Sequence, residues 1–204
     1  MKPNTPSDAT LLRQMAAGDE QAFASLYRRH KQAIYRFAIL MCGSINIAEE
    51  VTQEVFMVLV REPRRFDPSR GQLLPYLYGV ARIHVLRFLK RERPYVSLIE
   101  EAEDENSDLS YVAQDDPFGD CSRNEVARLV RRAVLTLPPK YREVVVLCDF
   151  QEVSCAEAAL ALDCALGTVS SRLHRGHLML LKKLSAIGRL DPASAGAQQM
   201  RCFA

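Results

Sequence analysis

The segment 166-LGTVSSRLHRGH-177 combines hydroxyl, imidazole and guanidinium groups with apolar residues at helical spacing. Leu166, Val169, Leu173 and Leu180 recur at intervals of three, four and seven residues, so they share one face of a helix. The remaining surface of this helix carries Thr168, Ser170, Ser171, Arg172, His174, Arg175 and His177. It contains no acidic residue, whereas a solvated helix face usually mixes charges of both signs. The pattern therefore favours an anionic partner.

A second, shorter helix is predicted immediately before this one. Ser154 and Glu157 form the capping-box pattern in 154-SCAE-157, and the alanine-rich residues that follow let another helix cross closely. Residues 163–165 then form a turn. Two helices joined by so short a turn, with a basic polar face on the second, are typical of a helix-turn-helix that binds the DNA major groove. An ordinary helical hairpin is the alternative, and the acid-free face disfavours it.

Helical patterns fill most of the remaining chain. One helix carrying Phe23, Leu26, Tyr27, Ile34, Phe37 and Met41 should end at Gly43, and a second carrying Val51, Val55, Val58 and Leu59 should end near Pro63. The segment 66-FDPSRG-71 is turn chemistry, and a third helix should run from about Leu74 to Arg91 and stop before Pro94. Another helix is predicted from Val126 to Leu137, where Pro138 and Pro139 end it and start the next.

Charge is unevenly distributed along the chain. Residues 97–122 contain nine acids and no Lys or Arg, which leaves 16 acids against 27 bases on the other residues. This stretch lacks helical periodicity and predicts an acidic flexible linker between two basic blocks. Basic blocks bind polyanions through counterion release. Because of this segregation of charge, we expect the free protein to be compact, with the linker lying against the basic domains.

Several other classes of protein lack support. No apolar run is long enough to span a membrane, and the first ten residues lack the apolar core of a signal peptide, so a cytoplasmic location is expected. The six cysteines form no Cys-x-x-Cys pair, and His174 with His177 offers too few ligands for a metal site. The chain also has no Gly-rich phosphate loop or Ser-His-Asp set. We therefore expect no enzyme activity, cofactor, metal or small-molecule substrate.

Two blocks of the sequence resemble a known family in the expected order. The run 137-LPPKYREVVVLCDFQEVSCAEAALALDCALGTVSSRLHRG-176 resembles region 4 of extracytoplasmic-function (ECF) sigma factors of bacterial RNA polymerase, in the sigma-70 family. The segments 22-AFASLYRRHKQAIYRFA-38, 48-AEEVTQEVFMVL-59 and 66-FDPSRGQLLPYLYGVAR-82 resemble region 2. The resemblance covers about residues 8–187 and needs both blocks, which makes it far more specific than a lone helix-turn-helix.

The resemblance implies an all-α fold of two small helical domains. Region 2, a helical bundle that binds core polymerase and the −10 element, would span residues 8–94. The acidic linker would span 95–122, and region 4, the helix-turn-helix that binds the −35 element, would span 123–187. Residues 188–204 would be a C-terminal tail. The implied function is an alternative sigma factor that directs promoter-specific initiation and is controlled by an anti-sigma factor.

Residue roles follow where the motifs match. In region 4, the resemblance places Ser171, His174 and Arg175 at the −35 element, with Ser170 beside them and Thr168 and Arg172 as phosphate or supporting contacts. Arg175 is the best candidate for base readout, because a guanidinium can bridge O6 and N7 of guanine.

In region 2, the resemblance places Glu50, Gln53, Glu54 and Phe56 against the polymerase clamp. The alternative for the two acids is an ordinary solvated helix face. Residues that would meet the −10 element are Tyr76, Tyr78, Arg82, His84, Arg87, Lys90 and Arg91. Aromatic rings can stack on unpaired bases while cations hold phosphates. The alternative for the two tyrosines is a place in the core.

Some positions depart from the family's usual residues. The family often has Trp at Tyr76, Asn at Ile83, and Lys or Arg at Ser170. Leu160, often polar in the family, is a candidate apolar contact for a partner. These departures affect promoter sequence and melting strength more than the general function.

The implied partners are core RNA polymerase, through its β′ clamp and β flap, promoter DNA, and a membrane-linked anti-sigma factor. A competing hypothesis is a sigma mimic that sequesters an anti-sigma factor without initiating transcription, but the basic faces are intact. Another is an unrelated DNA-binding regulator, which would leave residues 20–93 unexplained.

Overall fold

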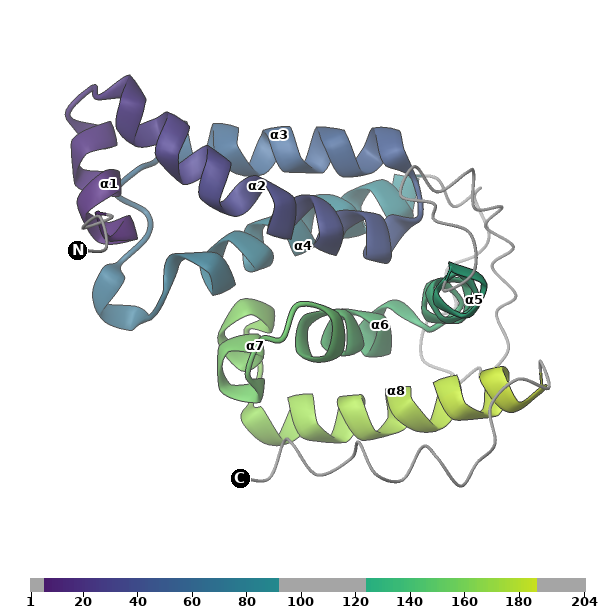
Figure 1. The fold of residues 1–204 in the computed structure, drawn as a ribbon. Coiled ribbons are helices and arrows are strands. Elements are labelled where there is room, and N and C mark those ends of the chain that lie inside the picture. Colours follow the sequence, from purple (N-terminus) through teal and green to yellow (C-terminus); the bar gives the residue numbers. More distant parts are fainter. Residues whose placement is uncertain (1–5, 92–123, 187–204) are drawn as a thin grey trace, which may run out of the picture.

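The computed structural model describes residues 6–91 and 124–186 (Figure 1). Over these two stretches the secondary structure is helical and no strand forms, which confirms the predicted all-α class. The elements are α1 (Asp8–Ala16), α2 (Glu20–Cys42), α3 (Ile45–Arg61), η1 (Pro68–Arg70), α4 (Leu73–Arg91), α5 (Asn124–Leu135), α6 (Pro139–Val145), η2 (Val146–Phe150), α7 (Cys155–Leu162) and α8 (Leu166–Ala186). The linker and tail predicted over 95–122 and 188–204 lie outside the described residues.

The N-terminal half is a bundle in which α2, α3 and α4 pack side by side (Figure 1). Asp19 caps α2 by accepting hydrogen bonds from the backbone N–H groups of Gln21 and Ala22. Gly43 ends the same helix with a φ of 72°, a left-handed conformation that glycine adopts without a side-chain penalty. The predicted helix end at Gly43 is therefore confirmed.

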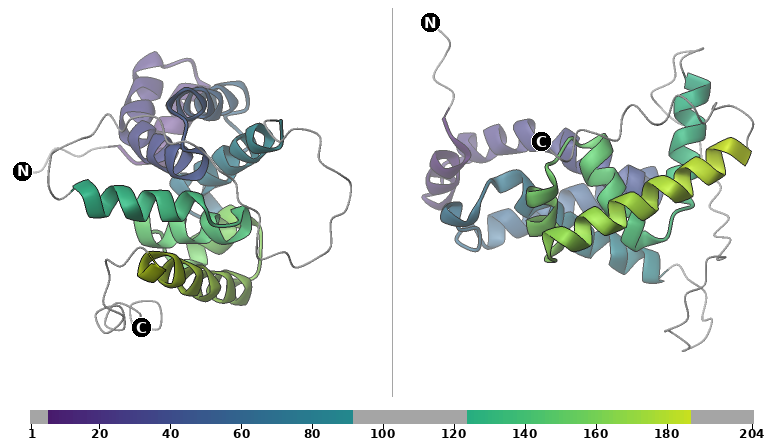
Figure 2. Two further views of the ribbon diagram at one scale, coloured as in Figure 1. Left: turned by 90° about the vertical axis from the view of Figure 1, so that its right-hand side faces the viewer. Right: turned by 90° about the horizontal axis from the view of Figure 1, so that it is seen from below.

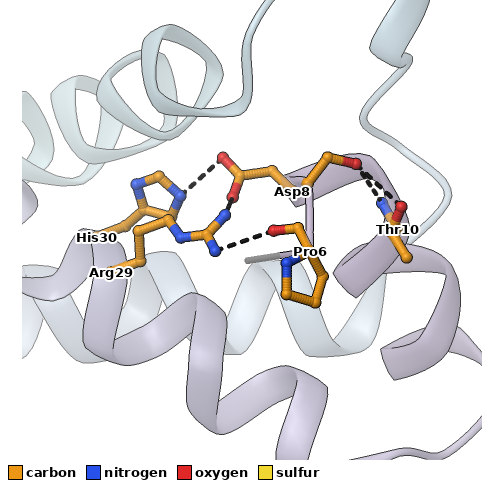
Figure 3. Close-up of polar contacts among 6 residues, drawn as sticks. Pro6, Asp8, Thr10, Arg29 and His30 are labelled. Atoms are coloured by element: carbon orange, nitrogen blue, oxygen red, sulfur yellow. Dashed lines mark hydrogen bonds and ion pairs between the residues drawn. The ribbon is translucent and has the colours of Figure 1, made fainter. Parts of the chain in front are cut away.

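A charged clasp attaches α1 to α2 (Figure 3). The Asp8 carboxylate, in the first turn of α1, accepts a hydrogen bond from the Arg29 guanidinium and lies 2.9 Å from Nε2 of His30. Arg29 also donates to the carbonyl of Pro6 at 3.0 Å. The clasp fixes the start of the chain against the middle of α2.

The C-terminal half contains the predicted helix-turn-helix. The capping box at α7 is confirmed, because Ser154 accepts from the backbone N–H of Glu157 and the Glu157 carboxylate accepts from the N–H of Ser154. The long helix α8 crosses α6 closely at Gly176, where a Cβ would lie 2.7 Å from Cγ2 of Val145. Val169 and Leu173 anchor α8 in the core, whereas Leu166 is exposed, so the predicted apolar stripe begins at Val169.

The two halves pack directly on each other. Helix α4 lies against α7, and the C-terminal end of α2 meets α5 and α6 (Figures 1 and 2). Buried side chains from both halves, such as Leu77 and Val144, belong to one continuous apolar core. The compactness expected from the charge pattern is therefore present as direct domain contact, while the expected role of the linker falls outside the described residues.

Candidate nucleic-acid interface

The first turns of α8 present an outward polar surface. Ser171, His174 and Arg175 are all exposed, and we call these three residues the recognition surface. Val169 and Leu173, on the opposite side of the helix, are buried and hold α8 against its domain. The surface is thus available to a ligand while the helix that carries it is firmly attached.

The neighbouring hydroxyls are engaged with their own helix. Ser170 donates to the carbonyl of Leu166 at 3.2 Å, and Ser171 donates to the carbonyl of Thr168 at 3.1 Å. Each serine oxygen can still accept a hydrogen bond. Thr168 and Ser170 are half-buried beside the recognition surface, which suits supporting contacts.

Arg172 differs from Arg175 although both lie on α8. Its Nη1 lies 3.2 Å from Oε1 of Glu143 on α6, so the guanidinium points into the protein. Glu143 is only 1% exposed, and a buried carboxylate of this kind requires a positive partner. In this structure Arg172 ties α8 to α6, which favours the supporting role over a phosphate contact.

His177, one turn beyond the recognition surface, pairs with a carboxylate. Its Nε2 lies 2.7 Å from Oδ2 of Asp149, and this hydrogen bond raises the pKa of His177 despite its partial burial. The pair links α8 to η2. We therefore assign His177 to the positioning of α8.

The residues predicted to meet the −10 element divide along α4. Tyr78 is 1% exposed, packs on Phe37 with ring centroids 5.4 Å apart, and donates its hydroxyl to Oε1 of Gln151 at 3.2 Å. Burial raises the pKa of Tyr78 to about 12. Its ring cannot stack on a base in this conformation, so the structure replaces that expectation with a core position. Tyr76 is half-buried against Phe66, with centroids 5.4 Å apart.

Further along α4 the side chains become accessible. Arg82 is half-buried on Glu143, with Nε 2.7 Å from Oε2. His84 is also half-buried, and burial lowers its pKa. Arg87, Lys90 and Arg91 are exposed. A free cationic surface therefore exists at the C-terminal end of α4 and not along its whole length.

The predicted polymerase contacts on α3 also separate into two groups. Glu50 and Gln53 are exposed and Glu54 is half-buried. Phe56 is instead 2% exposed and packs edge-on against Tyr27, with centroids 4.8 Å apart. Its expected role as a surface contact is corrected, because the ring belongs to an aromatic cluster that joins α3 to α2.

Other kinds of site receive no support in the described residues. Cys42, Cys148, Cys155 and Cys164 form no disulfide there, and no group of three or more metal-ligating side chains occurs within residues 6–91 and 124–186. Searching those same residues also reveals no helix that is both long and apolar enough to cross a membrane.

Sequence reasoning missed the buried pair Arg142 and Glu143 on α6. Both are charged, yet they are 4% and 1% exposed. The available signal was their place in 141-YREVVVL-147, where two opposite charges precede an uninterrupted apolar run. Charged residues at buried positions of a helix need partners, and these partners come from several distant segments.

Comparison with known proteins now gives the class. The family model for Sigma-70 region 2 matches residues 26–95, and the model for Sigma-70, region 4 matches residues 127–180. The first match ends just beyond α4, and the second contains the helix-turn-helix and the recognition surface. The fold and site therefore define a two-domain transcription protein of the sigma-70 type.

Full-length relatives narrow the assignment. The chain is 31% identical over 177 residues to the ECF RNA polymerase sigma factor SigW of Bacillus subtilis strain 168, covering 85% of this chain and 94% of SigW. It is 32% identical over 180 residues to the ECF RNA polymerase sigma factor SigM of Mycobacterium tuberculosis H37Rv, covering 87% and 85%. The chain belongs to the ECF RNA polymerase sigma factors, as its motifs indicated.

Solved structures agree on the fold. CnrH in complex with the cytosolic domain of CnrY has a TM-score of 0.65 at 25% identity, covering 89% of this chain and 99% of CnrH. The sigma factor RpoE in complex with the anti-sigma factor NepR from Bartonella quintana has a TM-score of 0.58 at 21% identity, covering 80% and 96%.

Proposed function

We propose that this ECF sigma factor binds core RNA polymerase and directs promoter-specific initiation, with α8 reading the −35 element. One observation carries this assignment: Ser171, His174 and Arg175 are exposed together on a helix whose opposite face is buried. Arg175 has the reach and geometry to donate two hydrogen bonds to guanine in the major groove. Thr168, Ser170 and Arg172 support this surface from beside and behind it.

The −10 element would be bound by α4. The exposed cations Arg87, Lys90 and Arg91 suit phosphate contacts, and half-buried Tyr76 can stack on an unpaired base after a small rearrangement. Arg82 and His84 would join them only where Arg82 leaves Glu143. On α3, the polar residues Glu50, Gln53 and Glu54 would contact the β′ clamp of the polymerase, and region 4 would contact the β flap.

Control by an anti-sigma factor is the regulatory part of the proposal. The CnrH and RpoE structures were each solved with a bound partner, and the CnrH complex contains the cytosolic domain of CnrY. We infer a comparable membrane-linked anti-sigma factor for this chain. As a polymerase subunit it would act in the cytoplasm, without a catalytic site or a small-molecule substrate of its own.

Run-off transcription tests the function directly. Core polymerase with the wild-type protein should transcribe a subset of a promoter-fragment pool. Arg175→Ala should reduce those transcripts by about 10- to 100-fold, because a lost bidentate base contact costs about 1–3 kcal/mol. Lys182→Ala is the matched control, since Lys182 is an exposed cation on the same helix beyond the recognition surface.

Three outcomes are distinguishable. Transcripts that fall with Arg175→Ala and persist with Lys182→Ala support the proposal. Equal loss in both variants would reduce the contact to nonspecific charge. No transcripts with the wild type, combined with tight binding to an anti-sigma factor, would favour the sigma mimic and overturn the proposal.

A further inference from the structure

The contact between the two halves is made by α4 lying across α7 (Figure 1). A Cβ added to Gly79 of α4 would lie 3.0 Å from the carbonyl oxygen of Ala161, so the two backbones nearly touch. Ala158 and Ala161 of α7 are buried in this crossing. The small residues of α7, which the sequence suggested would admit a neighbouring helix, therefore admit a helix of the other domain.

Glu143 of α6 takes a partner from each half of the molecule. Its Oε2 lies 2.7 Å from Nε of Arg82, and its Oε1 lies 3.4 Å from Nη2 of the same residue. The same Oε1 also lies 3.2 Å from Nη1 of Arg172. One buried carboxylate thus holds one arginine from each predicted DNA-binding helix.

The preceding residue, Arg142, makes a parallel connection. Its guanidinium donates to the carbonyl oxygens of Leu135 and Leu137 in its own half and to that of Met41 in the other. Met41 lies in the last turn of α2, where carbonyls lack intrahelical partners and carry the negative end of the helix dipole. A buried cation at that position satisfies both requirements.

Each of these charges also keeps a partner when the halves separate. Glu143 would retain Arg172, and Arg142 would retain the carbonyl of Leu137. Separation would therefore strand no buried charge, which is the usual penalty for breaking a buried ion pair. What separation releases is Arg82, together with the face of α4 that now lies on α7.

The docked arrangement hides the two DNA-binding faces unequally. The recognition surface on α8 stays exposed, whereas Tyr78 and Arg82 of α4 are engaged by Gln151 and Glu143. The −35 and −10 elements are separated by roughly 25 base pairs, which is about 85 Å at about 3.4 Å per base pair. Two domains in direct contact through α4 and α7 cannot reach both elements at once.

We propose that Arg142 and Glu143 form a charge latch that holds the two DNA-reading domains together and withholds Arg82 from DNA. Opening the latch exposes the α4 face without disturbing the recognition surface. The protein therefore has a built-in resting state in which −35 contacts are available and −10 contacts are not. This inference rests on the proposed function for its meaning, but the latch itself is a property of the isolated chain.

The test uses a wedge in the crossing and a neutralised carboxylate. Gly79→Leu places a side chain between α4 and α7 while adding a good helix former to α4. Gly167→Leu is the matched control, because no atom lies within 4 Å of a Cβ built at Gly167. Glu143→Gln keeps the size of the side chain and removes its charge.

Two readouts are made on the full chain: the radius of gyration by small-angle scattering, and the affinity for a labelled single-stranded oligonucleotide by fluorescence anisotropy. Gly79→Leu and Glu143→Gln should both increase the radius of gyration and raise oligonucleotide affinity at least fivefold. Gly167→Leu should change neither. Arg82→Ala should expand the molecule without the gain in affinity, because it removes the released contact itself.

Circular dichroism first establishes that each variant keeps its helical content, and Glu143→Gln carries the test if Gly79→Leu fails to fold. Unchanged radii in the folded variants would overturn the latch, as would expansion with no gain in affinity. A latch that opens in a protein unable to support transcription would overturn the proposed function and leave the latch standing. Transcription by a protein whose variants stay compact would do the reverse.

Discussion

His30 and His177 both face a carboxylate, yet their pKa values move in opposite directions. His30 is buried between α1 and α2, and this loss of hydration lowers its pKa below the ordinary 6.5, although Asp8 partly opposes the change. His177 is less buried, and its hydrogen bond to Asp149 raises its pKa. Burial decides the first case and the hydrogen bond decides the second.

These shifts predict opposite effects of pH on the free energy of unfolding. The unfolded chain protonates His30 at a higher pH than the folded protein does, so stability from this site falls as pH drops below about 6.5. The contribution of His177 is present below about 6.5 and is lost as pH rises through its folded pKa. A nuclear magnetic resonance titration of the imidazoles checks both assignments. A midpoint for His30 above that for His177 would show that the burial argument is incorrect.

Single residues also show where sequence reasoning succeeded and where it stopped. Val169, on the buried side of α8, and Arg175, on the exposed side, lie where helical periodicity predicted. Tyr78 and Phe56 lie in the core instead of on the expected surfaces. Spacing on a helix identifies which residues share a face, but it does not reveal which face another element will cover.

At the scale of elements, local chemistry predicted the helix ends well. Gly43, the Pro138–Pro139 pair and the Ser154 capping box each mark a boundary in the structure. These signals act within a few residues, so they can be read from the sequence alone. The π turn over Val146–Phe150 was not predicted, because it lies in an apolar run with no punctuating residue.

The capping box gives an element-scale prediction. Ser154→Ala should lower the free energy of unfolding by about 1 kcal/mol, since it leaves the start of α7 without its side-chain acceptor. Thermal unfolding by circular dichroism measures the change. Ser185→Ala is the control, because Ser185 is exposed near the end of α8 and bonds only to the carbonyl of Lys182. Equal stability of the two variants would contradict a stabilising role for the cap.

At the scale of the whole molecule, the docking of the two halves had no local signal. Arg82 and Glu143 are 61 positions apart, and nothing in either segment identifies the other as its partner. The charge pattern suggested a compact protein, but through the acidic linker. The described residues instead show two helical domains joined by a close helix crossing and by buried charges on α6.

The central claim is that a sigma factor with docked domains must open to read a promoter. The most direct test is the energy transfer between dyes at Gln32 on α2 and Lys183 on α8, two exposed positions in different halves. Genetically encoded reactive side chains avoid the native cysteines. Efficiency should be high in the free protein and fall sharply when core polymerase and promoter DNA are added. Unchanged efficiency in complexes that are actively transcribing would contradict the account.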